Sequence, residues 1–172
     1  MIVALIAAAV LVGIDQLIKL WAMNVLQEKE TIPFLHIGDF KIMDLTYLEN
    51  SGAVFGSFAG MRWLLVAVTG ILLVACIWGL IRYHDKSKIV CTCLTLILAG
   101  GVGNLIDRLF RGGLVIDYLD LKLFDFAIFN FADCCVVIGV GLFLIYILFI
   151  DPKQAKARKE AEKAKEESAA NG

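Results

Sequence analysis

Four apolar stretches, each long enough to cross a membrane, constrain this chain more than any other feature. They cover residues 2–25, 62–82, 89–109 and 132–150. A helix needs roughly 20 predominantly apolar residues to span the hydrocarbon core of a bilayer. The chain is 60% hydrophobic, which is more apolar than a soluble domain. We therefore predict an all-α polytopic membrane protein with four transmembrane helices.

The first apolar stretch has the position of a secretory signal peptide, which is the alternative to a transmembrane helix. It lacks a basic region before the apolar run, and it continues through Asp15, Lys19 and Trp21 with an amphipathic pattern. A signal peptide has a basic start and a shorter apolar region. We favour a retained transmembrane helix.

Basic residues predict how the helices are oriented. Arg82, Lys86 and Lys88 crowd the short loop between the second and third stretches, and six more lysines and arginines follow residue 150. Cytoplasmic loops carry such an excess of positive charge. We expect cytoplasmic termini, a membrane domain over 1–150, and a charged cytoplasmic tail over 151–172. The formal net charge of -1 does not point to a nucleic-acid partner.

The first outer loop, about 26–61, contains a segment typical of a strand. Residues 40–48 alternate partially between apolar and polar side chains, and Asn50, Ser51 and Gly52 follow them. Alternation is typical of a half-buried strand, and a cluster of turn-forming residues ends one. We expect a small β-containing outer element between the first two helices.

Charged side chains lie within the apolar stretches or at their ends. They are Asp15, Lys19, Asp107, Arg108 and Asp133. Ionisable groups inside a membrane are expensive to bury, and they commonly mark functional sites.

Four polar residues of the third stretch share one helical face. Asn104, Asp107, Arg108 and Arg111 are spaced at i, i+3, i+4 and i+7, which places them on the same side of a helix. A structural role, such as an ion pair between Asp107 and Arg111, is compatible with this pattern. Contact with a ligand is equally compatible, so both roles stay open.

Two aspartates in particular indicate chemistry. Asp117 sits between apolar residues of the second outer loop, and Asp133 follows 16 residues later at the start of the fourth stretch. This separation lets both carboxylates reach the same outer level of the membrane. Two carboxylates in one low-dielectric site share a proton and titrate as a pair. One can then activate water while the other polarises a carbonyl.

Other chemistries find less support. His36 and His84 are the only histidines and both lie in loops, so no zinc motif of the His-Glu-x-x-His type is present. A serine–lysine dyad of Ser51 or Ser57 with Lys19 remains open. We expect the five cysteines, all within or beside apolar stretches, to be free thiols that pack as small hydrophobic side chains.

Two alternatives belong to other classes of protein. A transporter would use Asp15, Asp107, Asp117 and Asp133 as a proton relay, but the inner halves of the second and fourth stretches carry no acids. A scaffold without chemistry would leave Asp117 and Asp133 unexplained. We expect the remaining loop acids, Asp120 and Asp125, to be ordinary exposed side chains.

Five short motifs, in order, resemble the lipoprotein signal peptidases of bacteria, signal peptidase II. They are Asp15-Gln16, Glu49-Asn50-Ser51-Gly52-Ala53-Val54-Phe55-Gly56, Gly103-Asn104-Leu105-Ile106-Asp107-Arg108, Val115-Ile116-Asp117-Tyr118 and Phe129-Asn130-Phe131-Ala132-Asp133. The resemblance covers nearly the whole chain except the tail.

The resemblance implies an aspartic endopeptidase of the bacterial inner membrane. Such an enzyme removes the signal peptide of a prolipoprotein immediately before a diacylglyceryl-modified cysteine, without a metal or other cofactor. By motif, Asp117 and Asp133 would be the catalytic pair, and Asp15 a structural anchor. The residues that would position the substrate and support the pair are Asn50, Asn104, Arg108 and Asn130. The resemblance further implies membrane lipids as partners, a functional monomer, and an active site near the outer face.

Overall fold

The computed structural model describes residues 1–29, 31–52 and 58–150. Its four long helices are α1 (Ile2–Val25), α2 (Arg62–Tyr83), α3 (Lys88–Phe110) and α4 (Phe131–Ile145), and α4 continues as a π-helical turn, η2 (Tyr146–Ile150). All four, the last counted through Ile150, are long and apolar enough to cross a membrane. The four predicted spans are therefore confirmed, while the tail over 151–172 lies outside the described residues.

Helix α3 lies at the centre of the bundle. In the most apolar part of α3, 50% of the residues are buried, whereas 17–22% are buried in the corresponding parts of the other three helices. Small residues allow this close packing. A Cβ on Gly100 would overlap the carbonyl oxygen of Ala132, and one on Gly139 would lie 2.9 Å from the carbonyl oxygen of Cys93. Close backbone approach at small residues is a common way for helices to associate in membranes.

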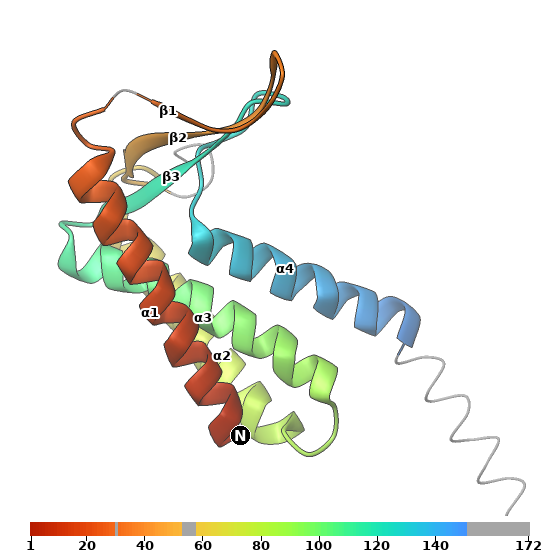
Figure 1. Cartoon of the computed structure of the whole chain (residues 1–172). Coiled ribbons are helices and arrows are strands. Elements are labelled where there is room, and N and C mark those ends of the chain that lie inside the picture. The colour runs from red at the N-terminus through yellow and green to blue at the C-terminus, as the bar shows by residue number, and fades with distance from the viewer. Residues whose placement is uncertain (30, 53–57, 151–172) are drawn as a thin grey trace, which may run out of the picture.

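A three-stranded antiparallel sheet lies at one end of the bundle, opposite to the N-terminus (Figure 1). Its strands are β1 (Ile32–Ile37), β2 (Phe40–Asn50) and β3 (Val115–Leu121), in that order. The predicted strand over 40–48 corresponds to β2. Strand β3 was not predicted, and it comes from the loop between α3 and α4.

A sharp reversal after α3 brings β3 back onto the sheet. Gly112 and Gly113 have φ angles of 67° and 98°, a left-handed conformation that glycine adopts without a steric penalty. The chain then pairs with β2, where Asp117 stands opposite Leu48 and Val115 opposite Asn50. A residue of the second outer loop therefore lies beside one of the first.

An apolar cluster joins the sheet to the end of α1. Ala22 and Leu26 pack against Ile116 and Tyr118 of β3, and all four are at most 3% exposed. The five cysteines are free thiols, as expected. Because β3 is anchored to α1 on one side and to β2 on the other, its polar residues are held at the end of the helices.

Candidate active site

Helix α4 begins with a capping box. The side-chain Oδ1 of Asn130 accepts from the backbone N–H of Asp133 at 3.0 Å, and Asp133 Oδ2 accepts from the backbone N–H of Asn130 at 3.0 Å. Reciprocal bonds of this kind satisfy amide groups that have no partner within the helix. The polar residues before the fourth apolar stretch are therefore the start of the helix itself.

Two further amides in the first turn of α4 donate to side chains from elsewhere in the chain. The N–H of Phe131 donates to the hydroxyl of Tyr118 at 3.1 Å, and the N–H of Ala132 donates to Asp15 Oδ1 at 3.0 Å. Unsatisfied backbone groups are costly at membrane depth. Asp15 of α1 therefore anchors the end of α4 that carries Asp133.

Asp117 meets this helix start from β3. Its side chain is buried, with 2% of the residue exposed. Asp117 Oδ1 accepts from Asn130 Nδ2 at 2.6 Å, and Asp117 Oδ2 accepts from Asn50 Nδ2 at 3.0 Å. One residue, Asn130, therefore contacts the carboxylates of both Asp117 and Asp133.

Asn104 of α3 completes the ring of amides. Its Nδ2 donates to Asp133 Oδ1 at 2.7 Å, and its Oδ1 accepts from Asn130 Nδ2 at 3.1 Å and from Lys19 Nζ at 2.9 Å. The lysine bond determines which way the Asn104 amide is turned, because an ammonium group only donates. As a result the Asn104 Nδ2 group faces Asp133.

The two carboxylates lie in different environments. The pKa of Asp117 is raised to about 6, chiefly by burial and in smaller part by the charge of Asp133, while hydrogen bonds from Asn50 and Asn130 oppose the shift. Asp133 is only partly buried. Paired acids in unequal environments are typical of sites where one is protonated and the other ionised.

Beneath this pair, Lys19 is the centre of a buried ionic network. Its Nζ lies 2.9 Å from Asp15 Oδ2 and 2.8 Å from Asp107 Oδ2, and Lys19 is fully buried. Asp107 also pairs with Arg111, and Gln16 Nε2 donates to Asp15 and Asp107 at 3.1 Å each. The predicted ion pair between Asp107 and Arg111 is therefore confirmed.

Arg108 holds the end of the first outer loop. Its Nη2 donates to the carbonyl oxygen of Gly52 at 2.9 Å, and the N–H of Gly52 donates to Asn50 Oδ1 at 2.9 Å. Arg108 is 8% exposed, and its Nε has no hydrogen-bond partner among the described residues. Residues 53–56 of the predicted motif lie outside the described residues.

The structure brings most of the predicted site residues into one place. Asp117, Asp133, Asn50, Asn104 and Asn130 form a continuous hydrogen-bonded set. Asp15 and Arg108 lie at its margins, where Asp15 bonds the start of α4 and Arg108 bonds the outer loop.

Sequence reasoning missed the role of Lys19. The signal was present, because Lys19 follows Asp15 by four residues inside an apolar span, where an isolated charge is expensive. Its Nζ contacts the carboxylates of Asp15 and Asp107 and the Asn104 side chain, and no serine is among these partners. Ser51 is exposed, and Ser57 lies outside the described residues.

Asp120 differs from its prediction as an ordinary exposed loop acid. It belongs to β3, where its Oδ2 accepts from Thr46 Oγ1 at 2.9 Å and pairs with Lys122 Nζ at 2.6 Å. It takes no part in the hydrogen-bonded set around Asp117. Asp125 is an exposed turn residue, as expected.

The sequence was compared with models of protein families. The model described as signal peptidase (SPase) II matches residues 7–149. The chain belongs to the signal peptidase II family. A lipoprotein signal peptidase of Clostridium acetobutylicum is 38% identical over 153 residues, 87% of this chain and 96% of that protein. One of Clostridioides difficile is 38% identical over 145 residues, 83% of this chain and 93% of that protein.

Two solved structures have a similar fold. A bacterial membrane enzyme solved by the in meso method at 2.3 Å resolution has a TM-score of 0.75 and 29% sequence identity, and the match covers 86% of this chain and 88% of that one. A second, solved at 1.9 Å, has a TM-score of 0.71 and 28% identity, over 87% of this chain and 95% of that one. The chain is therefore similar in fold to these two enzymes over 86–87% of its length.

Proposed function

We propose that this protein is a membrane aspartic endopeptidase that removes the signal peptide from lipid-modified prolipoproteins, cutting immediately before the diacylglyceryl-modified cysteine. Membership of the signal peptidase II family makes it a protease of prolipoprotein signal peptides. One observation carries the aspartic mechanism. Asn130 contacts the carboxylates of both Asp117 and Asp133, from β3 and from α4.

In this mechanism Asp133 acts as the base and Asp117 as the acid. Asp133 is the more exposed carboxylate, and it accepts a proton from the water whose oxygen attacks the scissile carbonyl. Asp117, with a pKa of about 6, supplies the proton of the pair and donates a hydrogen bond to the carbonyl oxygen. The tetrahedral intermediate collapses as Asp133 returns a proton to the leaving amine. No covalent acyl-enzyme, metal or cofactor takes part in this scheme.

The surrounding amides orient the pair and leave its oxygens able to accept further hydrogen bonds. Each oxygen of Asp117 and Asp133 accepts one hydrogen bond from an amide group. A carboxylate offers about four lone-pair sites, so each acid retains acceptor capacity toward water and substrate. Arg108, through the Gly52 carbonyl, positions the loop end that carries Asn50.

The membrane setting fits a lipid-bearing substrate. We propose that residues 1–150 form the peptidase domain and that both termini and the tail over 151–172 are cytoplasmic, so that the site lies near the outer face of a bacterial inner membrane. The site is at the sheet end of α3 and α4, where a substrate anchored by its diacylglyceryl group can enter sideways from the bilayer. A monomer contributes every residue of the site described above.

Conservative substitutions test the catalytic pair. Asp117→Asn and Asp133→Asn should each lower the cleavage rate of a lipid-modified precursor in detergent by at least about 100-fold, because each removes a proton-transfer group. Asp120→Asn is the matched control, since Asp120 lies on the same strand outside the site. Near-normal cleavage by either site variant would disprove the pair.

A second experiment tests the substrate. A precursor whose cysteine lacks the diacylglyceryl group should be cleaved much more slowly than the modified precursor, since it loses the apolar contacts that hold it at membrane level. Purified protein and the two precursors are compared by gel shift. Equal turnover of the two precursors would contradict recognition of the lipid while leaving the catalytic pair intact.

A further inference from the structure

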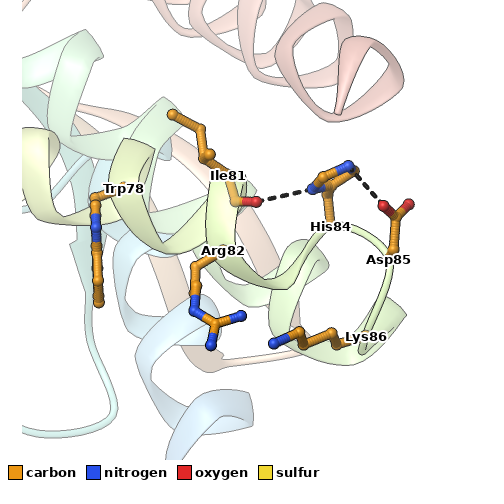
Figure 2. Close-up of a pocket in the computed structure, with 6 residues that line it drawn as sticks. All are labelled: Trp78, Ile81, Arg82, His84, Asp85 and Lys86. Atoms are coloured by element: carbon orange, nitrogen blue, oxygen red, sulfur yellow. Dashed lines mark hydrogen bonds and ion pairs between the residues drawn. The ribbon is translucent and has the colours of Figure 1, made fainter.

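An open pocket lies at the turn between α2 and α3 (Figure 2). This turn is at the end of α3 that is remote from the sheet (Figure 1). Its volume is about 320 Å³. The side chains that line it are Trp78, Ile81, Arg82, His84, Asp85 and Lys86. None of these residues belongs to the site at the sheet, so the pocket is a separate feature.

Two cations of this pocket are available to a ligand. The side chains of Arg82 and Lys86 project to the same side of the turn (Figure 2). Within the described residues neither forms an ion pair, and the Lys86 Nζ lies 5.9 Å from the centroid of the Tyr83 ring. Lys88, at the start of α3, adds a third positive charge to the same turn. An anion is the ligand that suits this arrangement.

Among the described residues that line the pocket, Asp85 is the one with a carboxylate, and its contacts lead away from these cations. Asp85 Oδ2 lies 2.8 Å from His84 Nε2, and His84 Nδ1 lies 2.8 Å from the carbonyl oxygen of Ile81. Figure 2 shows this chain of contacts on the opposite side of the turn from the Arg82 guanidinium. The cationic side of the pocket therefore keeps its charge.

The pocket also has an apolar wall that continues onto the exposed apolar surface of α2. Trp78 is 65% exposed and Ile81 is 55% exposed. Trp78 precedes Arg82 by four residues, so both lie on one face of the helix. Tryptophan favours the membrane–water interface, and arginine at a helix end reaches toward the headgroups. An apolar wall followed by cations toward the turn matches the acyl chains and then the phosphate of a phospholipid.

We infer that the pocket of Trp78, Arg82 and Lys86 binds the headgroup of an anionic phospholipid. The phosphodiester lies between the guanidinium and the ammonium, and the acyl chains run along Trp78 and Ile81. A free phosphate would use the two cations but would leave the apolar wall without a role. This site is independent of the proposed peptidase activity.

Quenching of Trp78 fluorescence measures the binding directly. The full-length protein with Trp21→Phe and Trp63→Phe retains Trp78 as its single tryptophan. It is reconstituted in phosphatidylcholine vesicles that contain increasing amounts of either dibrominated phosphatidylglycerol or dibrominated phosphatidylcholine. We expect quenching by the brominated phosphatidylglycerol at a lower mole fraction. Equal quenching by the two lipids would overturn the inference.

Charge variants locate the binding. Arg82→Gln combined with Lys86→Gln should weaken the apparent affinity for phosphatidylglycerol more than about tenfold, since each cation near an anionic lipid contributes about fivefold. Lys163→Gln combined with Lys165→Gln removes the same charge from the tail and should leave the affinity unchanged. Arg82→Lys, which retains the charge, should preserve most of the binding. An equal loss in the tail variant would show general surface charge and would overturn the inference.

Inorganic phosphate distinguishes the two sources of the anion. An excess of phosphate, compared with sodium chloride of the same ionic strength, should displace no more lipid than the chloride does. Complete displacement by phosphate alone would assign the pocket to a free anion and would contradict the lipid.

Discussion

The shifted pKa of Asp117 has a measurable consequence for stability. The unfolded carboxyl has a pKa of 3.8 and the folded one a pKa of about 6, so between these values the folded protein binds more protons. The free energy of unfolding therefore falls as the pH rises through this window, by about 3 kcal/mol at most. Below pH 4 the contribution of Asp117 to stability is fully present.

Asp117→Asn should remove this dependence. We expect the difference in melting temperature between the variant and the wild type to shift in favour of the variant from pH 4 to pH 7, and to be constant above. Thermal unfolding in detergent at several pH values measures the difference, and Asp120→Asn serves as the control. A difference that does not change with pH would show that Asp117 ionises with an ordinary pKa.

The charge of Asp133 should contribute to the raised pKa of Asp117. Since that charge raises the pKa of Asp117, Asp133→Asn should lower it. Carbon-13 NMR of labelled aspartate carboxyls, in detergent micelles, follows the titration. A pKa of Asp117 that stays the same or rises in the variant would contradict the electrostatic contact between the two acids.

The buried lysine should contribute strongly to the stability of the fold. Lys19→Met leaves Asp15 and Asp107 without the ammonium that lies 2.9 Å and 2.8 Å from them. Removing one partner of a buried ion pair costs about 3–5 kcal/mol, and the loss should appear as a lower melting temperature and less folded protein. Lys29→Met, at an exposed lysine, is the matched control. Equal stability of the two variants would contradict the network.

Among the helices, the close contact between α3 and α4 determines where Asp133 lies. Asn104 of α3 and Asn130 at the start of α4 are joined by a hydrogen bond of 3.1 Å, so a change in the separation of these helices also changes the geometry of the site. The contact depends on positions where a side chain has no room. Gly139 is such a position and Gly141, on the same helix, is not.

A pair of alanine substitutions tests this contact. A Cβ on Gly139 would lie 2.8 Å from Ile97 Cγ1 and 2.9 Å from the Cys93 carbonyl oxygen, whereas a Cβ on Gly141 would have nothing within 4 Å. Gly139→Ala should destabilise the protein by about 1–3 kcal/mol, the usual cost of overpacking. Gly141→Ala should be close to neutral. Thermal unfolding compares the two, and similar melting temperatures would contradict the tight helix contact.

For the molecule as a whole, the distribution of charge predicts its orientation in the membrane. The sheet and the α2–α3 turn lie at opposite ends of α3 (Figure 1), and the basic residues Arg82, Lys86 and Lys88 gather at the turn. By the positive-inside rule we expect this end to be cytoplasmic. A green fluorescent protein fused after Gly172 should therefore fluoresce, and alkaline phosphatase inserted at Gly38, in the turn between β1 and β2, should be active. The reverse pattern would invert the topology and place the site on the cytoplasmic side.

Hydropathy and charge along the chain are sufficient to predict the four spans and strand β2. A span depends on the length of an apolar run, which is local, because a helix satisfies its own backbone hydrogen bonds in a medium without water. The sequence also predicts a special role for Asp117 and Asp133, because a carboxylate beside apolar residues at membrane level is costly unless other groups stabilise it.

Tertiary structure alone decides how the site is assembled. Strand β3 forms because a glycine reversal lets residues 115–121 pair with β2, a contact between segments about 70 residues apart, and pairing over such a distance has no local signature. The packing of α1 against α3 places Lys19 between Asp15 and Asp107. It also lets Lys19 bond Asn104, whose amide nitrogen then faces Asp133. A buried ion or amide finds its partners only after helices distant in sequence have met.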